Sequence, residues 1–288
     1  MPSFDYLAPS TVEDAVRALA TPGARPLAGG TDLLVQLRSG RVRPPLVVDL
    51  KRIAGASGIR AQGGGFVIGA ATPGAVIGEH VALSRAWPGV VEAASVIGSV
   101  QIQGRATLAG NLCNASPAAD SVPALIAARA LCVIVGPAGR RELPVEAIAT
   151  GPGRTSLAPG EFVLEIRLPP RSARAADAYL RLIPRTEMDI AVVGAAVNLW
   201  LDVAGTITHA HVALGAVAPT ALLVPAAGAA LVGRRLDAAA LAALDAAAGA
   251  ACRPISDKRG SAEYRTRIAG VLARRAAAIA YQRAGGRA

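Results

Sequence analysis

The stretch from Arg105 to Asp120, RATLAGNLCNASPAAD, is the feature that most constrains what this chain can fold into and bind. It has almost no charge or bulk, so its backbone N–H groups can come close to a ligand. Its Ser, Thr and Asn side chains can hydrogen-bond phosphate or sugar oxygens. A second stretch of this kind, PLAGGTDLL, runs from Pro26 to Leu34. Two such loops, roughly 80 residues apart, predict one large phosphorylated ligand held from two sides.

Composition narrows the possible functions. The 288 residues are 52% hydrophobic but only 3% aromatic, so the core must consist of Ala, Val, Leu and Ile. With so few aromatic platforms, binding of single-stranded nucleic acid by base stacking is disfavoured. The net charge of +10 comes mostly from scattered Arg residues, without a long basic block or a zinc-finger spacing. This pattern favours a solvated surface with a protein interface, and no nucleic-acid partner is expected.

The cysteines and the N-terminus indicate where the chain works. Cys113, Cys132 and Cys252 are far apart and form no CxxC pair, so they supply neither a four-cysteine iron–sulfur site nor a disulfide framework. A reducing, cytoplasmic location is expected. The start, MPSFDYLAPS, lacks the basic and apolar regions of a signal peptide. No run of about 18 apolar residues occurs, so no membrane span is expected.

The pattern of apolar residues predicts an N-terminal β-α-β-α-β unit that ends near residue 55. Ser10 or Thr11 is expected to cap its first helix and Thr31 its second. The Gly29-Gly30 turn would then deliver a helix N-terminus, where free N–H groups and the helix dipole favour a phosphate. In this unit we expect strands at 4–6, 25–28 and 46–50, and helices at 12–22 and 32–38.

The remainder is predicted to be mixed α and β. Arg171 to Asp177 is interpreted as a linker, and a hairpin is expected to turn at Ala204-Gly205. The strands expected around them are 66–70, 131–135, 161–168, 190–203 and 206–217. The helices expected are 73–80, 88–97, 122–130, 222–231, 238–251 and 262–283. The prediction is an α+β fold with two or three lobes.

Common nucleotide motifs are missing. Gly29-Gly30-Thr31 is not the GxGxxG of a Rossmann unit, and no GxxxxGK[ST] loop occurs. Asp49 is therefore interpreted as a strand-end residue instead of a ribose contact. Asp120 has two interpretations that could both hold: it caps the following helix, or it accepts hydrogen bonds from ribityl or ribose hydroxyls.

The histidines and Cys113 give weaker evidence for a functional site. His209 and His211 share one side of an expected strand, but no further metal ligands are evident, so surface positions are favoured. Cys113 could have a redox role or bind a cofactor covalently, although packing is the better interpretation. Three histidines at these positions support no Ser-His-Asp triad, and neither catalytic nor metal-binding residues are assigned.

Four motifs in a fixed order resemble one known family. AGGTD at 28–32, ATLAGNLCNASPAADSVPAL at 106–125, RTEMDIAVVGAAV at 185–197 and SAEYR at 261–265 look like the FAD-binding medium subunit of the molybdenum hydroxylases, the xanthine dehydrogenase and carbon monoxide dehydrogenase family. The resemblance covers nearly the whole chain. It implies a two-lobed FAD-binding domain of the vanillyl-alcohol-oxidase (PCMH-like) type at residues 1–172, with lobes at about 1–55 and 56–172. A smaller α+β domain would follow at 173–288.

The resemblance also implies the cofactor-binding residues. Two loops would clasp the FAD pyrophosphate, and further residues would lie by the flavin or its linker. The first loop is Pro26, Leu27, Ala28, Gly29, Gly30, Thr31, Asp32 and Leu33; the second is Thr107, Leu108, Ala109, Gly110 and Asn111; the others are Ile97, Ser116, Asp120, Arg181, and Leu164 or a neighbour on its strand. Ala109 departs from the family, which has Gly there. Its methyl group is compatible with binding if the position does not need a positive φ.

By the same resemblance, FAD on this chain would take electrons from the [2Fe-2S] clusters of a small subunit and pass them to an external acceptor. The substrate would be oxidised at the molybdenum cofactor of a large subunit, and the complex is expected to be a dimer of heterotrimers. The acceptor stays open between NAD, oxygen, a quinone and others. Two alternatives are a stand-alone flavin oxidase and a scaffold subunit whose flavin site has decayed.

Overall fold

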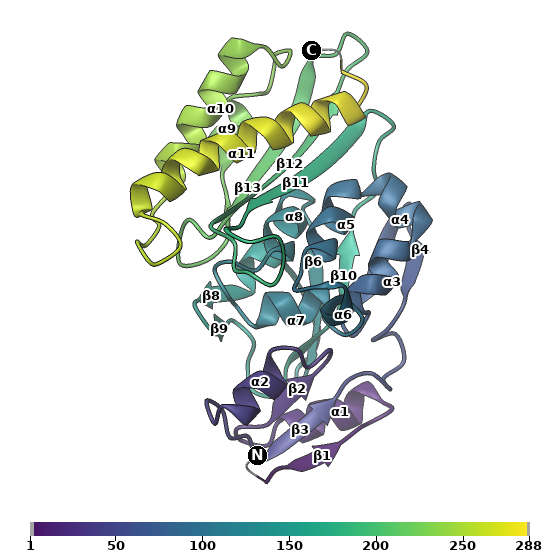
Figure 1. The fold of residues 1–288 in the computed structure, drawn as a ribbon. Coiled ribbons are helices and arrows are strands. Elements are labelled where there is room, and N and C mark those ends of the chain that lie inside the picture. Colours follow the sequence, from purple (N-terminus) through teal and green to yellow (C-terminus); the bar gives the residue numbers. More distant parts are fainter. Residues whose placement is uncertain (1–2, 287–288) are drawn as a thin grey trace.

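The computed structural model describes residues 3–286 and is a mixed α/β structure built on three main sheets (Figure 1). The sheets follow one another along the molecule. The N-terminal strands lie at the bottom of Figure 1, and the C-terminal helices lie at its top. The α+β architecture predicted from the sequence is confirmed.

The first sheet has the strand order β1-β3-β2. Its strands are parallel, as the predicted β-α-β-α-β unit requires. Thr11 caps its first helix by accepting a hydrogen bond from the Asp14 N–H, as expected. The second helix starts without a side-chain cap, so the predicted capping role of Thr31 is wrong. The elements are β1 (Asp5–Leu7), α1 (Val12–Leu19), β2 (Arg25–Leu27), α2 (Leu33–Arg38) and β3 (Leu46–Asp49).

The second sheet is antiparallel, with strand order β4-β5-β10-β6-β7. Its strands are β4 (Ile59–Gln62), β5 (Gly65–Gly69), β6 (Leu131–Gly136), β7 (Gly139–Pro144) and β10 (Phe162–Leu168). The helices between β5 and β6 are α3 (Gly74–Glu79), α4 (Val81–Ala86), α5 (Pro88–Ser95), α6 (Val100–Gln103), α7 (Leu108–Cys113) and α8 (Ser121–Ala127). A short 3₁₀ helix (Val145–Ala147) leads into the small hairpin β8 (Ala149–Gly151) and β9 (Arg154–Thr155).

The third sheet is antiparallel, and helices cover both of its faces. Helix α11 runs across the outer face beside α10, and α5 and α8 pack on the inner face (Figure 1). Its elements are β11 (Ala175–Leu182), β12 (Val193–Leu201), β13 (Ile207–Gly215), β14 (Leu222–Leu223), α9 (Pro225–Ala229), α10 (Ala238–Ala251) and α11 (Ala262–Arg283). Across residues 3–286, none of the helices is both long and apolar enough to cross a membrane.

Two apolar cores join the sheets, and a third packs helices against the outer face of the third sheet. One packs helix α1 of the first sheet against Val135, Phe162 and Leu164 of the second. The largest joins the second sheet and its helices to Tyr179 and Ala196 on the inner face of the third. The last lies between the outer face of the third sheet and helices α10 and α11. Shared cores hold the loops at the boundaries between sheets in a fixed relation.

The Arg171 guanidinium fastens the second sheet to the third. It lies 4.0 Å above the centre of the Trp87 ring, and it donates hydrogen bonds to Asp177 and Asn198, both at 2.8 Å. The pair with Asp177 is almost fully buried. Burial raises the pKa of the Asp177 carboxyl, and the guanidinium beside it opposes that shift. This segment is therefore a rigid junction.

The interpretation of residues 171–177 as a linker is confirmed for residues 171–174, which connect β10 to β11, and is wrong for residues 175–177. Strand β11 already begins at Ala175, and Asp177 is buried within it. Arg171 and Asp177, at the two ends of this stretch, pair with each other inside the structure. Charge in the sequence does not distinguish a solvated segment from a buried ion pair.

Other differences are local. The stretch from Arg105 to Asp120, predicted as a loop, contains helix α7. The elements that were not predicted are strands β4, β7, β8, β9 and β11 and helices α4 and α6. The helix expected at 222–231 is a short strand followed by α9, because Pro225 occupies a first-turn position and cannot lie inside a helix.

We expect Arg171→Met to lower the free energy of unfolding of the apoprotein by about 3–5 kcal/mol, because Asp177 would stay buried without its partner. Urea unfolding measures this change. Arg17→Ala, which removes an exposed pair with Asp14, is the control and should change stability little. Equal effects of the two substitutions would show that the junction contributes no more than a surface ion pair.

Candidate functional site

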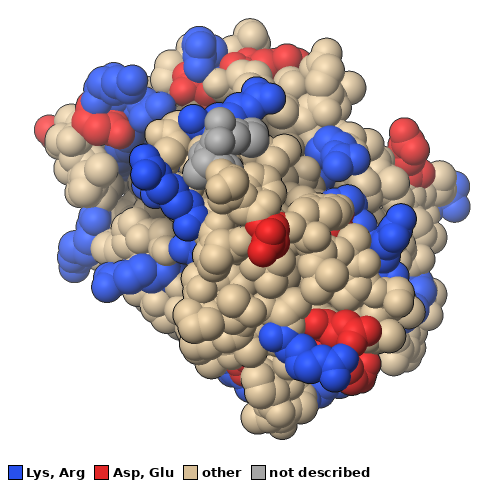
Figure 2. Space-filling model, turned by 90° about the horizontal axis from the view of Figure 1, so that it is seen from below, with Lys and Arg blue, Asp and Glu red and all other residues tan. Residues whose placement is uncertain are grey.

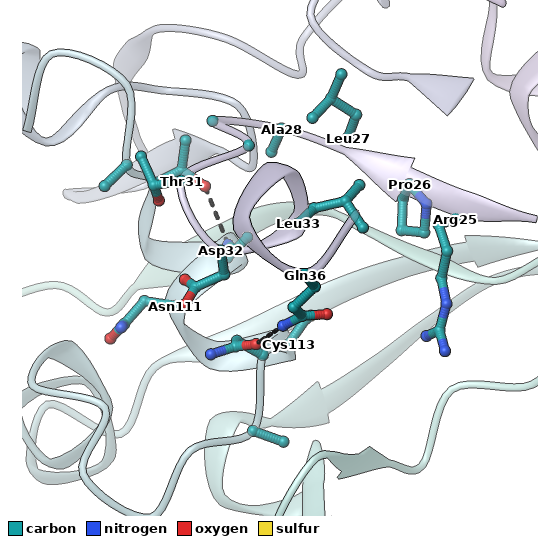
Figure 3. Close-up of a pocket in the computed structure, with 18 of the residues that line it drawn as sticks. Arg25, Pro26, Leu27, Ala28, Thr31, Asp32, Leu33, Gln36, Asn111 and Cys113 are labelled. Carbon is teal, nitrogen blue, oxygen red and sulfur yellow. Dashed lines mark hydrogen bonds between the residues drawn. The ribbon is translucent and has the colours of Figure 1, made fainter. Parts of the chain in front are cut away.

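A cavity of about 670 Å³ lies between the first two sheets (Figure 3). This volume is in the range usual for small-molecule and cofactor sites. One wall comes from residues 25–42 and the opposite wall from residues 106–117. The cavity is completed by Leu50, Ala70, Ile97, Pro152, Gly153, Leu157, Phe162 and Val163.

The first wall is the turn between β2 and α2. A Cβ atom on Gly29 would lie 1.9 Å from the carbonyl oxygen of Arg105, so only glycine allows the two walls to approach this closely. Gly30 has a φ of +80°, which also favours glycine. Within the described part of the chain, the backbone N–H groups from Gly29 to Leu33 donate no hydrogen bond to protein. They are available to an anion on the cavity side.

Three side chains support this turn from behind. Lys51 Nζ donates to the carbonyl oxygen of Ala28 at 3.2 Å and pairs with Asp49 at 2.8 Å, and Asp49 accepts from the Tyr6 hydroxyl at 2.6 Å. Burial would raise the pKa of Asp49, but the hydrogen bonds from Lys51 and Tyr6 outweigh it and lower the pKa. In a trans peptide the carbonyl and the following N–H point in opposite directions. Lys51 therefore fixes the direction of the Gly29 N–H.

The second wall is the start of α7. Thr107 caps this helix: its hydroxyl accepts a hydrogen bond from the Gly110 N–H at 3.0 Å. The Asn111 side-chain oxygen accepts from both the N–H and the hydroxyl of Ser121 at the start of α8. The anion loop predicted here is thus a short helix N-terminus tied to the next helix.

Ala109 fits this wall without strain. It lies inside α7 and is not among the residues with positive φ. The position does not need a positive φ, which was the condition for Ala109 to be compatible with binding in place of the family's Gly.

Of the predicted cofactor-binding residues, all but four line the cavity. Those that do are Pro26, Leu27, Ala28, Gly29, Gly30, Thr31, Asp32, Leu33, Ile97, Thr107, Ala109, Gly110, Asn111 and Ser116. Leu108 and Leu164 instead face apolar cores. Phe162 and Val163, neighbours of Leu164 on β10, do reach the cavity. The structure thus favours the expectation that a neighbour of Leu164 would pack there.

Asp120 and Arg181, the other two predicted residues outside the lining, bind each other. Arg181 donates to the Asp120 carboxylate at 2.7 Å, and the Tyr179 hydroxyl donates to its other oxygen at 2.9 Å. Burial raises the pKa of Asp120, opposed by Arg181 and Tyr179. Asp120 makes no capping hydrogen bond to α8, so that interpretation is wrong. Its contact with a flavin stays a prediction.

Several lining residues were not predicted. Arg25 and Arg41 are the cationic side chains on the wall, and Gln36 and Asn114 lie on opposite sides of the cavity. Arg25 directly precedes the first small-residue stretch, so its position was a usable signal. Arg41 follows α2, and the tip of the β8–β9 hairpin comes from a distant segment; no local pattern marks either of them.

Cys113 lines the cavity but is not activated. Burial raises the pKa of its thiol to about 12, so the thiol is protonated at neutral pH. This supports the packing role over a nucleophilic one.

The two strand histidines lie away from the cavity. His209 and His211 both pack edge-on against Trp200 on β12. Across residues 3–286, no group of three or more His, Cys, Asp or Glu side chains is placed to hold a metal ion.

The cavity's donors suit an elongated phosphorylated ligand. Free backbone N–H groups come from one wall and a helix start from the other, and such groups bind phosphate oxygens well. Arg25 and Arg41 add positive charge, while Ile97, Phe162 and Val163 supply apolar surface. These residues fit the pyrophosphate and rings of FAD.

Comparisons with protein families agree with this chemistry. Residues 2–171 match the family described as the FAD binding domain in molybdopterin dehydrogenase. Residues 178–280 match the CO dehydrogenase flavoprotein C-terminal domain. Together the two matches span most of the chain.

Individual relatives are similar over their full length. The carbon monoxide dehydrogenase medium chain of Hydrogenophaga pseudoflava is 35% identical, with 98% of each chain covered. A putative xanthine dehydrogenase FAD-binding subunit of Escherichia coli is 32% identical, with 98% of this chain and 97% of the relative covered. A chain of the reconstituted CO dehydrogenase from Oligotropha carboxidovorans superposes with a TM-score of 0.94 at 36% identity, covering 98% of this chain and 99% of that one.

We expect Cys113 in the folded protein to react with iodoacetamide at pH 8 roughly a thousandfold more slowly than in urea, because little thiolate forms. Mass spectrometry of the peptide that contains Cys113 follows the reaction. The same peptide from urea-unfolded protein is the control. Alkylation at similar rates in both states would contradict the protonated, packed thiol.

We expect Ala109→Gly to destabilise the apoprotein by about 1 kcal/mol, since glycine weakens a helix interior and a buried methyl group is lost. Ala115→Gly is the matched control. Ala115 is also buried on this wall but has a φ of 51°, so relief of its backbone should make that change nearly neutral. Urea unfolding compares the two, and a stabilising Ala109→Gly would show that Ala109 is strained.

Proposed function

The chain belongs to the family of FAD-binding subunits of molybdopterin dehydrogenases, and we propose that it is the FAD-carrying electron-transfer subunit of a heteromeric molybdenum hydroxylase. The observation that carries this proposal is the cavity between two facing small-residue loops, Gly29–Leu33 and Thr107–Asn111. Bound FAD would supply the redox chemistry, because a flavin can accept electrons singly and release them in pairs.

The chain's own residues would bind and orient the cofactor. The free N–H groups of Gly29 to Leu33 would donate to one side of the pyrophosphate, and the N-terminal turn of α7 would donate to the other. Lys51 would act indirectly, since it holds the first loop in place through its hydrogen bond to the Ala28 carbonyl. Asn111 lines the cavity, and its side-chain oxygen also ties α7 to the start of α8. Ile97 and Val163 would pack against apolar parts of the cofactor.

The proposed partners are a large subunit that carries the molybdenum cofactor and a small subunit that carries [2Fe-2S] clusters. Relatives support this organisation, because they include medium chains and subunits of dehydrogenase complexes. We propose a dimer of these heterotrimers. A cytoplasmic setting is proposed as well, and the three free cysteines are compatible with it.

We also propose that residues 1–172 form the FAD-binding domain, with lobes at about 1–55 and 56–172, and that residues 173–288 form the second domain. The cores support these boundaries. Residues of the third sheet, α10 and α11 make up a core of their own, and the first sheet packs against the second through another. The two family matches meet in the same region of the chain.

We expect the native complex to contain one FAD per copy of this chain. Gly29→Ala should lower that FAD content at least tenfold, roughly the effect of one misplaced binding loop. The new methyl group would collide with the Arg105 carbonyl and push the loops apart. Visible absorption and extraction of FAD measure the content, and thermal unfolding shows whether the variant folds.

Gly249→Ala is the matched control, because a Cβ atom there would have its nearest neighbour at 3.8 Å, in ordinary contact. It should keep its full FAD content. A folded, colourless parent complex that FAD cannot reconstitute would contradict the proposed function. Turnover of an organic substrate by this chain alone would support the stand-alone oxidase instead.

A further inference from the structure

One side-chain hydrogen bond joins the two walls of the cavity. Gln36 Nε2 on α2 donates to Asn114 Oδ1 at the end of α7, at 3.1 Å. Both residues line the cavity, and they are 78 positions apart in the chain. In Figure 3 Gln36 lies between Arg25 at one end of the view and Thr31 and Asn111 at the other. The bond therefore crosses between the walls part-way along the cavity.

Within residues 3–286, this bond is the single polar link between the walls. Among the residues that the structure describes, no other hydrogen bond or ion pair connects residues 25–42 with residues 97–117. The walls also touch where Gly29 meets the Arg105 carbonyl, but that contact is steric and sets only how close they can come.

Backbone hydrogen bonds hold the residues at both ends of this link in place. The Gln36 carbonyl accepts hydrogen bonds from the Arg41 and Val42 N–H groups, which fixes the end of α2. The Asn114 N–H donates to the Gly110 carbonyl within the turn that ends α7. Each side chain thus extends from an ordered backbone, so the length of the link fixes the spacing of the walls.

We propose that Gln36 and Asn114 are a positioning pair that holds the two phosphate-binding loops at the spacing FAD needs and slows its release. This proposal rests on the proposed function, because it assumes that FAD occupies the cavity. The pair acts through the walls and not through direct contact with the cofactor. Losing the link lets the walls separate, so FAD leaves faster from a protein that is otherwise folded.

The test measures FAD release from Gln36→Ala, Asn114→Ala and the double variant. Each single change should speed release about fivefold, as expected for one lost hydrogen bond. The double variant should release FAD no faster than either single one, because both remove the same bond. The fluorescence of freed FAD follows the rate after dilution, and melting of the apoprotein reports on folding.

Two further variants sharpen the test. The exchange Gln36→Asn with Asn114→Gln keeps the total length of the link and should return release to near the parent rate. Gln103→Ala removes a similar hydrogen bond, to the Ser95 carbonyl, from a residue outside the cavity, and should leave release unchanged.

Two results would overturn the pair's role while the proposed function stands. One is release at the parent rate from both single variants. The other is a double variant whose effect is the product of the single effects, which indicates two independent contacts with FAD. A parent that binds no FAD would overturn the proposed function and the positioning role together.

Discussion

The contact between Gly29 and the Arg105 carbonyl is the constraint on which the site depends. Gly29 belongs to the first sheet's lobe and Arg105 to the second's, and a Cβ atom on Gly29 would lie only 1.9 Å from that oxygen. The absence of a side chain lets two backbones meet, and the cavity is the space left beside their contact. The small residues on both loops are therefore a steric requirement of the assembled walls as well as a means of approaching phosphate.

The supports of this contact lie at increasing distance from it. Lys51 holds the Ala28 peptide from behind, and Gln36 links the walls further along the cavity. Beyond them, the pair of Asp120 and Arg181 ties the segment after α7 to β11, although neither residue lines the cavity. This pair connects the third sheet to the region of the site, and the apolar core shared with α8 reinforces it. A sheet that contributes no lining residue can thus still determine the geometry of the cavity.

Local patterns predicted much of this arrangement, and they failed where distant residues decide the structure. The periodicity of the Ala-rich segments gave α10 and α11 their observed bounds, because a helix is specified by neighbouring residues. The two small-residue stretches predicted most of the cavity wall. Asp120 was expected to cap a helix, but burial next to Tyr179 and Arg181 determines its partners. Gln36 and Asn114 are ordinary polar residues, and only the assembled fold brings them together.

Charge on the cavity wall explains why backbone groups carry so much of the proposed binding. Although the chain has a net charge of +10, Arg25 and Arg41 are the only residues of the described part of the chain that place basic side chains on the wall. Figure 2 shows Lys and Arg side chains spread over the surface in the view from below. Asp32 is the acidic residue on the wall, and burial raises its pKa. An anion near Asp32 raises the pKa of its carboxyl further, and the protonated carboxyl repels the anion less than a carboxylate does. Backbone N–H groups have fixed directions, so they can select the position of a pyrophosphate that mobile surface arginines would only attract.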